Sequence, residues 1–576
     1  MTFELVRRPS MNSPLTPVAP VARPAVPLWA AWIPIVVLIG LLVVNVRIYG
    51  DAATYGPNQI ALLIAAAVAV LVGLPLGIRF QQMLEGIKTS IHSALTAILI
   101  LLLIGSLIGT WMISGIVPAM IYYGLQILDP KIFLCASVVV CSIVSVATGS
   151  SWSTVGTVGV ALMGIGQALG VSPAMTGGAI ISGAYFGDKI SPLSDTTNLA
   201  AAMAGTDLIT HVKYMLYTTV PSISITLLIF LAIGFSSEAS APIGQTQAMM
   251  SALDEKFNLT PVLFVVPLIV LGLVIAKVDA VAALFIGTIL GGVFAVILQP
   301  TVITDVAGLT ESDVRQTTNS TAEESNAPIA TQAPSYLKRS YVALINAMAN
   351  EVKIIPDAEV SLMQSNLQEQ KLAAARTQTG NAELSWAQFE ELNVVLTESF
   401  ADRESELEGK VAAAGLMKGK GMNGMLATVW LIICAMCFGG VMEACGLLQR
   451  ITNSLLSFAN STGSLVATTV GSCVFVNLTA SDQYLSIVVP GRMFRETFEE
   501  RGLAPQLLSR TLEDAGTVTS VLVPWNTCGA FQASTLGIAT LVYLPFCFFN
   551  WISPLMTILF AVAGIKIARL PAAKNR

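Results

Sequence analysis

The stretch Gly-Asp-Lys-Ile-Ser-Pro-Leu-Ser-Asp-Thr-Thr-Asn, residues 187–198, is a dense polar cluster set between apolar segments. An Asp or Lys at the centre of a bilayer costs about 3 kcal/mol on insertion scales, so such residues usually line an ion or substrate path. Pro192 lacks an amide proton and interrupts the helix, which frees backbone carbonyls to face a cavity. Asp188, Lys189 and Asp195 are therefore predicted to be functional.

The composition of the chain is that of a membrane protein. Of its 576 residues, 54% are hydrophobic and 11% are charged, against about 25% charged in soluble domains. Residues 93–128, 132–187, 451–481 and 515–565 hold no Asp, Glu, Lys or Arg, and one bilayer crossing needs about 20 apolar residues. The sequence predicts an all-α polytopic membrane protein.

Twelve apolar spans are predicted, with two interrupted regions between them. The spans cover residues 28–46, 58–77, 94–117, 132–148, 153–170, 213–235, 260–277, 280–299, 425–447, 463–480, 530–549 and 552–569. The interrupted regions, 173–205 and 482–527, are broken by Gly, Pro and acids, as re-entrant or discontinuous helices are. If 132–170 and 463 to about 500 are re-entrant hairpins, and 173–205 and 505–527 each cross as a broken helix, the count is eleven. If all twelve spans cross and the interrupted regions do not, it is twelve.

We divide the chain into four parts. Residues 1–27 are expected to be a disordered cytoplasmic tail, and 28–300 and 425–576 to be the two membrane halves. Residues 301–424 are predicted to be an extramembrane insertion, with 17 Asp and Glu against 10 Lys and Arg. The insertion is either a regulatory or partner-binding element or a solvated linker between the halves.

The two halves are predicted to be repeats, because many secondary transporters are built from related halves that meet at the binding site. A shift of 332 residues superposes four pairs of Gly or Pro and sets Ser150 opposite Asp482. The twelve-crossing count makes the repeats parallel, and the eleven-crossing count makes them inverted. We favour inverted repeats with re-entrant hairpins and broken helices, because the hairpin arms are short and meet at a polar turn. Two cytoplasmic ends would require an even count.

The polar residues of the interrupted regions supply oxygen ligands, which alkali and alkaline-earth ions prefer. The predicted ion- or substrate-binding residues are Ser150, Ser151, Asp188, Ser191, Ser194, Asp195, Thr196, Thr197, Asn198, Asp482, Asp514, Asn526 and Thr527. Na+ is placed at Asp188, Asp195 and Asp514. Lys189, Arg492 and Glu513 are predicted charge partners, with Lys189 serving either a structural ion pair or transport itself.

Carboxylates of this kind are sufficient to exchange Na+ for H+. Burial favours the neutral form of a carboxyl group, so a site of this kind can hold a proton or, once ionised, Na+. No cofactor is predicted, because the chain has only two histidines and its eight cysteines lie mostly in apolar segments. It also lacks the phosphate-loop, HExxH and GxSxG motifs, so neither an enzyme nor an ATP-driven pump is expected. A passive channel is the weaker alternative from another class.

Several motifs carry a resemblance to a known family. Gly-Asp-Lys-Ile-Ser-Pro-Leu-Ser-Asp-Thr-Thr-Asn-Leu-Ala at 187–200, Leu-Glu-Asp-Ala-Gly-Thr-Val-Thr-Ser at 512–520 and Pro-Trp-Asn-Thr-Cys-Gly at 524–529 resemble the NhaC-type Na+/H+ antiporter family. Thr-Gly-Ser-Ser-Trp-Ser-Thr-Val-Gly-Thr at 148–157 matches the same pattern. The resemblance implies two inverted halves with re-entrant hairpins, Na+/H+ exchange and a homodimer.

Related members of that group exchange malate and protons for lactate and Na+, or carry amino acids, so a Na+- or H+-coupled carrier of a small organic anion or amino acid is the alternative. The expected location is the cell (inner) membrane, with lipid, Na+ and protons as partners and no nucleic acid. Arg7, Arg8 and Arg23 precede the first span, which places the N-terminus in the cytoplasm by the positive-inside rule.

Overall fold

The computed structural model describes residues 26–236, 243–307, 335–355, 357–392 and 408–570. Almost all of the described secondary structure is helical, which confirms the all-α membrane fold. The tail at 1–25 and residues 308–334 and 393–407 lie outside the described residues, so the disorder expected for the tail is not addressed. Large apolar side chains remain exposed on several long helices, for example Leu71 at 66% and Ile297 at 68%, as lipid contact requires.

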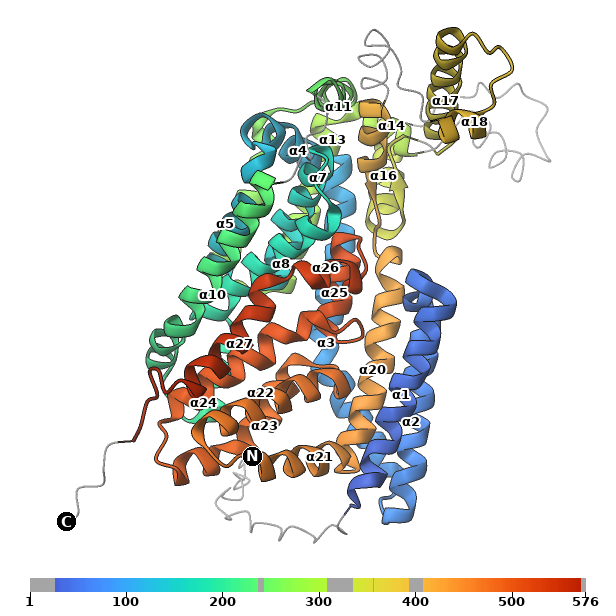
Figure 1. Ribbon diagram of the computed structural model, residues 1–576. Helices are drawn as coiled ribbons and strands as arrows, with labels where there is room; N and C mark the ends of the chain where they lie inside the picture. The colour runs from blue at the N-terminus through green and yellow to red at the C-terminus, as the bar shows by residue number, and fades with distance from the viewer. Residues whose placement is uncertain (1–25, 237–242, 308–334, 356, 393–407, 571–576) are drawn as a thin grey trace, which may run out of the picture.

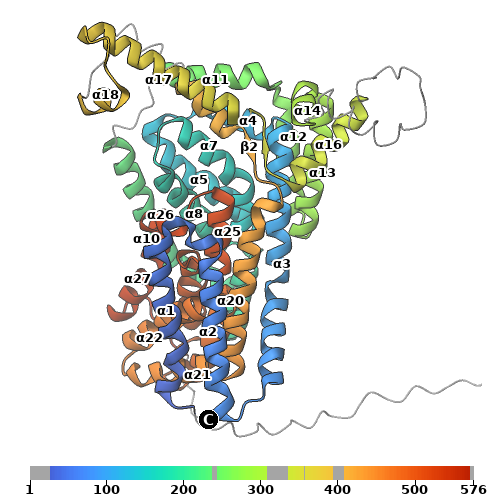
Figure 2. The same ribbon diagram turned by 90° about the vertical axis from the view of Figure 1, so that its right-hand side faces the viewer.

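Four long helices stand side by side at one edge of the molecule (Figure 2). They are α1 (Leu28–Tyr49), α2 (Pro57–Gly73), α3 (Phe80–Ile113) and α20 (Leu426–Ala444). Small residues let α3 and α20 approach closely, because a Cβ atom on Gly86 would lie 2.6 Å from the Gly440 carbonyl oxygen. Helices far apart in the sequence therefore form one bundle beside the two repeats.

The first repeat consists of a hairpin, a broken helix and a long helix. In the hairpin, α5 (Pro130–Thr148) turns at Gly149 into α6 (Ser151–Thr154), which continues through a π-helical turn into α7 (Val160–Ala168). In the broken helix, α8 (Pro173–Ile190) is separated from α9 (Asp195–Ala204) by the extended residues around Pro192. Then α10 (Leu208–Ser236) follows.

The second repeat has the same order of elements. Its helices are α22 (Thr462–Thr479), α23 (Gln483–Glu500), α24 (Pro505–Leu512), α25 (Thr527–Leu536), α26 (Thr540–Tyr543) and α27 (Phe548–Val562). The helices α22, α24, α25 and α26 each begin 332 residues after α5, α8, α9 and α10, respectively. The hairpin α5–α7 lies in the upper part of Figure 1 and α22–α23 in the lower part, so the repeats are inverted.

The remaining elements connect these parts or cap the upper end of the molecule in Figure 1. They are α4 (Ile116–Ile127), α11 (Ile243–Lys256), α12 (Val265–Ile275), α13 (Ala280–Leu298), α14 (Pro300–Ala307), α16 (Tyr336–Ala349), α17 (Asp357–Thr379), α18 (Trp386–Leu392) and α21 (Leu447–Leu455), with an antiparallel strand pair of β1 (Val352–Lys353) and β2 (Lys418–Gly419). Parts of the predicted insertion pack closely on α3, since the Ser106 hydroxyl donates to the Met348 carbonyl at 2.8 Å.

By length and composition, the described residues contain eight helices able to cross a membrane, or up to ten if each bent pair is one span. The predicted count is higher because it includes segments that the structure breaks. Residues 153–170 are the short second arm of the first hairpin, and 530–549 bend by 89° between α25 and α26. The predicted turn near Ser150 and the predicted break at Pro192 are both present.

Candidate functional site

The breaks in the two hairpins and the two broken helices each place a polar residue at the start of a half-helix. The side chain of Ser150 accepts a hydrogen bond from the Ser153 amide, and Asp482, at the equivalent position of the second repeat, accepts one from the Leu485 amide at 2.9 Å. Ser194 and Asn526 cap α9 and α25 in the same way and are also equivalent. Side-chain oxygens at these positions satisfy the free amides of a helix start.

A cavity of about 1000 Å³ lies where the half-helices meet, and it is called the large cavity below. Among the predicted binding residues, those that line it are Ser150, Asp188, Asp195, Asn198, Asp482 and Thr527. Its other lining side chains include Asp279 and one cation, Lys277. Since four carboxylates face one ammonium group, the lining is acidic and suits a cation.

Asp188, in the last turn of α8, is 5% exposed and has one engaged and one free carboxylate oxygen. Its Oδ2 atom accepts hydrogen bonds from the Ser151 amide at 3.0 Å and the Ser151 hydroxyl at 2.7 Å. Its Oδ1 atom is buried and makes no hydrogen bond of normal geometry with the described residues, and the Ser194 hydroxyl is the other polar group that acts on this carboxylate. An unpaired buried carboxylate oxygen is costly, so it is a natural ligand for an ion or proton.

The other two acids predicted beside it differ in exposure. Asp195 begins α9, is exposed to the cavity, and accepts a hydrogen bond from the Tyr484 hydroxyl at 2.5 Å. Asp482 is 2% exposed, and one of its oxygens is used as the cap of α23. The cavity therefore brings together three of the predicted carboxylates. They are Asp188 of α8, Asp195 of α9 and Asp482 at the start of α23.

Asp514 lies away from the large cavity in a fully buried network. It forms an ion pair with Lys189, and both side chains are 0% exposed. The Thr218 hydroxyl donates to Asp514 Oδ2 at 2.8 Å, and the Ser553 hydroxyl lies 3.3 Å from Oδ1 and 2.9 Å from the Lys189 ammonium. Each charge thus has several partners, as a buried ion pair requires. Of the two roles left open for Lys189, the structural pair is present.

Glu513 lies beside this network on a π-helical turn that spans 513–517. The Thr196 hydroxyl donates to its Oε1 atom at 3.1 Å, while the buried Oε2 atom has no partner among the described residues. Thr196 also contacts Ser194, whose side chain caps α9. Single π-helical turns occur often at functional sites. The contact links the second repeat to the first turn of α9.

Three further predicted ligands hold the backbone of the first break. The Ser191 hydroxyl donates to the Val146 carbonyl at 2.8 Å, the Thr197 hydroxyl donates to the Lys189 carbonyl at 2.9 Å, and the Asn198 amide donates to the Pro192 carbonyl at 3.1 Å. Arg492 is exposed on α23 and is absent from the residues that line the large cavity.

Several residues of the site carry no clear signal in the sequence. Tyr484 follows the predicted Asp482 closely, but nothing in its type marks it as the partner of Asp195. Asn477 donates to the Gly516 carbonyl at 2.7 Å and contacts Asn526, and an Asn inside an apolar span is the one hint of it. Single hydroxyls such as those of Thr218 and Ser553 are too common in membrane helices to stand out.

Inverted repeats, paired hairpins and broken helices around an acidic cavity define a secondary active transporter. The comparison with protein families is specific: the model of the Na+/H+ antiporter family matches residues 183–323 and 404–565, which together are more than half of the chain. The chain belongs to this family.

Characterised relatives share most of the chain. It is 34% identical over 520 residues to the Na(+)/H(+) antiporter NhaC of Alkalihalophilus pseudofirmus, covering 90% of this chain and 92% of the relative. The malate-2H(+)/Na(+)-lactate antiporter of Bacillus subtilis is 29% identical, covering 92% and 94%. The arginine/ornithine antiporter ArcD of Halobacterium salinarum is 28% identical, covering 93% and 92%. Family and relatives support Na+/H+ exchange by a multi-pass membrane protein.

Proposed function

We propose that the large cavity is the site at which this antiporter exchanges Na+ for H+, and that Asp188 is its principal ligand. The observation that carries the proposal is the free, buried Oδ1 atom of Asp188 at the junction of the half-helices. Asp195 and Asp482 add carboxylates, and Ser150 and Thr527 add neutral oxygens. Such a set matches the oxygen ligands that Na+ prefers.

Competition for the same carboxylates couples the two ions. A Na+ ion or a proton neutralises the free oxygen of Asp188, whereas the empty site leaves a charge in a low-dielectric environment, which is costly. The loaded forms can therefore reorient between the two faces and the empty form cannot. Exchange by this route needs no cofactor.

The ion pair of Lys189 and Asp514 has a separate role in the proposal. Lys189 follows Asp188 directly in the chain, and its ammonium group lies in α8, whose last turn carries the cation ligand. A cation bound at Asp188 brings a second positive charge near Lys189, and the Asp514 carboxylate offsets the repulsion between the two. The sequence predicts Na+ binding at Asp514. In this proposal Asp514 is instead the counter-ion of Lys189 and does not bind Na+ directly.

A second candidate is Na+- or H+-coupled transport of an organic acid or amino acid, and two observations favour it. The large cavity has a volume of about 1000 Å³, at the upper end of the usual range for small-molecule sites. Lys277 at its rim supplies a positive charge that an anionic substrate needs. The relatives named as a malate-2H(+)/Na(+)-lactate antiporter and an arginine/ornithine antiporter support this candidate. Arg492, on the exposed face of α23, is a weaker candidate than Lys277.

We further propose that the protein is a homodimer of the cell (inner) membrane with its N-terminus in the cytoplasm. The arginines at positions 7, 8 and 23 precede α1 and support that orientation. A fluorescent or enzymatic reporter fused to either end, active on only one face of the membrane, tests the orientation. Cross-linking of the purified protein in lipid tests the dimer.

Proton flux in liposomes tests the exchange. Purified protein is reconstituted in liposomes that contain a pH-sensitive dye, and Na+, K+ or Li+ is added outside. Proton efflux driven by Na+ alone is the expected result, and in Asp188→Asn it should need about 10- to 100-fold more Na+. If Na+ alone produces no flux but malate, lactate or an amino acid does, the second candidate replaces the first.

A further inference from the structure

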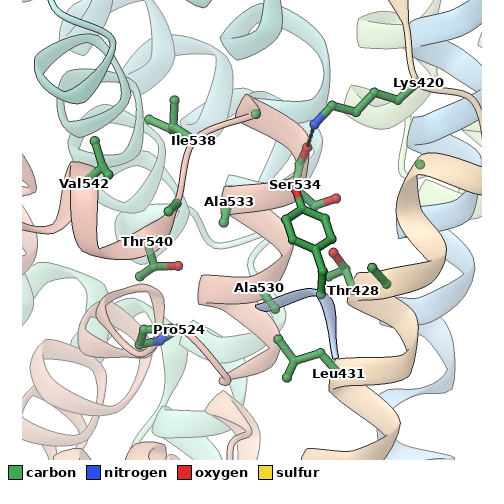
Figure 3. A pocket seen from close by; sticks show the side chains of 15 residues that line it. Lys420, Thr428, Leu431, Pro524, Ala530, Ala533, Ser534, Ile538, Thr540 and Val542 are labelled. Atoms are coloured by element: carbon green, nitrogen blue, oxygen red, sulfur yellow. Dashed lines mark hydrogen bonds between the residues drawn. The ribbon is translucent and has the colours of Figure 1, made fainter. Parts of the chain in front are cut away.

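A second cavity, called the small cavity below, lies against α25 and α26 and has a volume of about 360 Å³ (Figure 3). Its lining includes Pro524, Ala530 and Thr540, which are 332 residues after Pro192, Asn198 and Leu208 of the large cavity. Each cavity thus uses the same three positions of its own repeat. Because the repeats are inverted, equivalent linings place the two cavities on opposite faces of the protein.

Each cavity is also completed by one helix of the four-helix bundle. Ser93, Ala94 and Ala97 of α3 line the large cavity. Residues with the same relative spacing on α20, Ala427, Thr428 and Leu431, line the small cavity. The match extends the symmetry of the repeats to the bundle. Thr96 and Ile100 of α3 line the large cavity as well, so the shared feature is that one face of a bundle helix borders each cavity.

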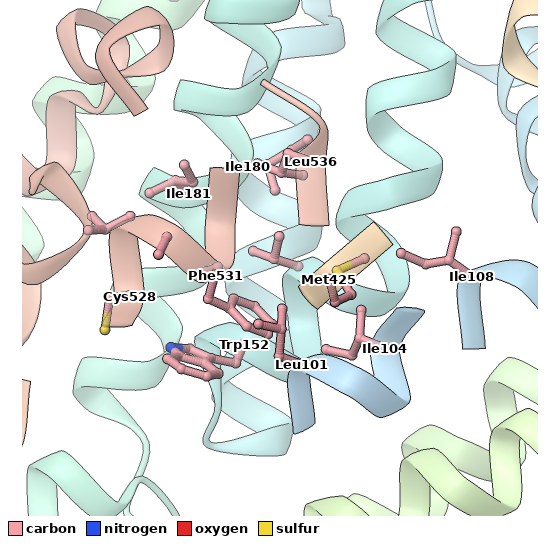
Figure 4. Packing of buried hydrophobic residues seen from close by; sticks show 14 of the residues in the cluster. Leu101, Ile104, Ile108, Trp152, Ile180, Ile181, Met425, Cys528, Phe531 and Leu536 are labelled. Carbon is pink, nitrogen blue, oxygen red and sulfur yellow. The ribbon is translucent and has the colours of Figure 1, made fainter. Parts of the chain in front are cut away.

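Buried hydrophobic side chains pack around Trp152 and Phe531 (Figure 4). Trp152, which lines the large cavity, stacks on Phe531 of α25 with ring centroids 4.0 Å apart and an interplanar angle of 19°. Phe531 is adjacent in sequence to Ala530, which lines the small cavity. The lining of the small cavity contains no carboxylate among the described residues, so the acids face only the large cavity.

Lys420 spans the small cavity from the bundle side to the repeat side. Its ammonium group donates a hydrogen bond to the Ser534 carbonyl in the last turn of α25, at 3.2 Å (Figure 3). A cation is favourable at the negative end of a helix, where carbonyls lack partners. Burial lowers the pKa of Lys420, and the neighbouring Lys418 lowers it further. The bond is partly buried, so it competes less with water than a bond on the open surface does.

The backbone that carries Lys420 is fixed to the bundle. Gly419 pairs with Val352 in the short β-sheet, and the Met422 amide donates to the Met348 carbonyl at 2.9 Å. Gly421 lies so close to α3 that a Cβ atom on Gly105 would be 2.4 Å from its carbonyl oxygen. Lys420 therefore connects a fixed platform at the end of the predicted insertion to a half-helix of the second repeat.

We infer that the small cavity is the access path from the face opposite the large cavity, and that Lys420 limits how far this path opens by anchoring α25. The inference rests on the proposed function, in which the site is reached from each face in turn. It assigns the end of residues 301–424 a role in gating, as a positioning element that contacts neither the ion nor its ligands. Loss of the bond should favour the conformation that opens the small cavity.

Cysteine accessibility tests the inference without any transport measurement. Leu208→Cys and Thr540→Cys report on equivalent positions of the large and small cavities, in a background in which the eight native cysteines are replaced by alanine. Lys420→Met should raise the rate of maleimide labelling at Thr540→Cys on the order of tenfold, as loss of one charge-assisted hydrogen bond allows, and lower it at Leu208→Cys. Lys420→Gln, which keeps a donor without the charge, should give a smaller change.

Lys418→Met is the matched control, because Lys418 is exposed and lies only two residues away. It removes the same charge and should leave both labelling rates unchanged. Unchanged rates in Lys420→Met, or rates that move in the same direction at both probes, would overturn the inference. Labelling needs neither Na+ nor proton flux, so such a result would not contradict the proposed Na+/H+ exchange. Equally, if the flux assay fails, labelling can still test the role of Lys420.

Discussion

The two broken helices share a backbone and differ in where they carry charge. In α8–α9, Asp188 and Asp195 flank the break and face the large cavity. In the second repeat, the position equivalent to Asp188 is Ser520, and the acids Glu513 and Asp514 lie earlier in the chain, buried on a π-helical turn. The two repeats therefore share the backbone arrangement of the broken helix, but their acidic residues occupy different positions in it.

This difference separates two tasks that a single symmetric site would have to combine. The acids of the first break are reachable from the cavity, and one oxygen of Asp188 is free to bind. Asp514 is dry and fully paired with Lys189 and two hydroxyls. The first region is therefore suited to exchange ligands, and the second to hold a buried ion pair.

The largest effect should come from the buried pair. Lys189→Met leaves the Asp514 carboxylate buried without its counter-ion, which costs about 3–5 kcal/mol. A fall in thermal stability in detergent, measured by intrinsic fluorescence, is the expected result. The double variant Lys189→Met/Asp514→Leu removes both charges and should recover most of the stability. If the double variant also transports like the unmodified protein, the pair is structural and has no part in coupling.

Asp188→Asn should give the second largest effect and should act on transport. An amide oxygen can still accept from Ser151, but the ligand charge is gone, so Na+ activation should weaken about 10- to 100-fold. The half-saturating Na+ concentration for proton flux in liposomes measures this. Asp305→Asn is the control, because Asp305 is a partly exposed acid on α14 that pairs with Lys256. Equal loss in both variants would contradict the assignment.

The sequence was sufficient for the positions of the breaks and for most of the residues around them. Pro192, the polar turn at Ser150 and the repeat shift of 332 residues are local features, because proline and glycine determine backbone geometry wherever the chain lies. The pairing of Lys189 with Asp514 and of Tyr484 with Asp195 depends on how distant helices cross, and no local pattern encodes that. Hydropathy alone leaves the number of crossings open for the same reason, since a short apolar segment is a hairpin arm or a span according to its neighbours.

The response to pH should distinguish which region carries the proton. If protons compete with Na+ at the first break, each unit of acidification should raise the half-saturating Na+ concentration by up to about tenfold, the limit for one competing proton. The measurement is Na+-driven flux in liposomes at several pH values. Repeating it in Lys189→Met/Asp514→Leu shows the contribution of the buried pair. A half-saturating concentration that does not depend on pH in the unmodified protein would rule out competition at the cavity.

The smallest effect should come from Asp195. It tests whether the burial of a carboxylate determines how much that carboxylate contributes to Na+ binding. Asp195 is exposed to the cavity, so water and salt screen its charge, and Asp195→Asn should raise the half-saturating Na+ concentration only about 2- to 10-fold. Tyr484→Phe removes the hydrogen bond to this carboxylate and keeps the charge, so its effect should be smaller still. Asp188 differs from Asp195 in that its free oxygen is buried and unpaired, which is the property that makes an ion there hard to replace by water. If Asp195→Asn weakens Na+ activation as much as Asp188→Asn, the ion is held between the two acids, and the free oxygen of Asp188 is not the principal ligand.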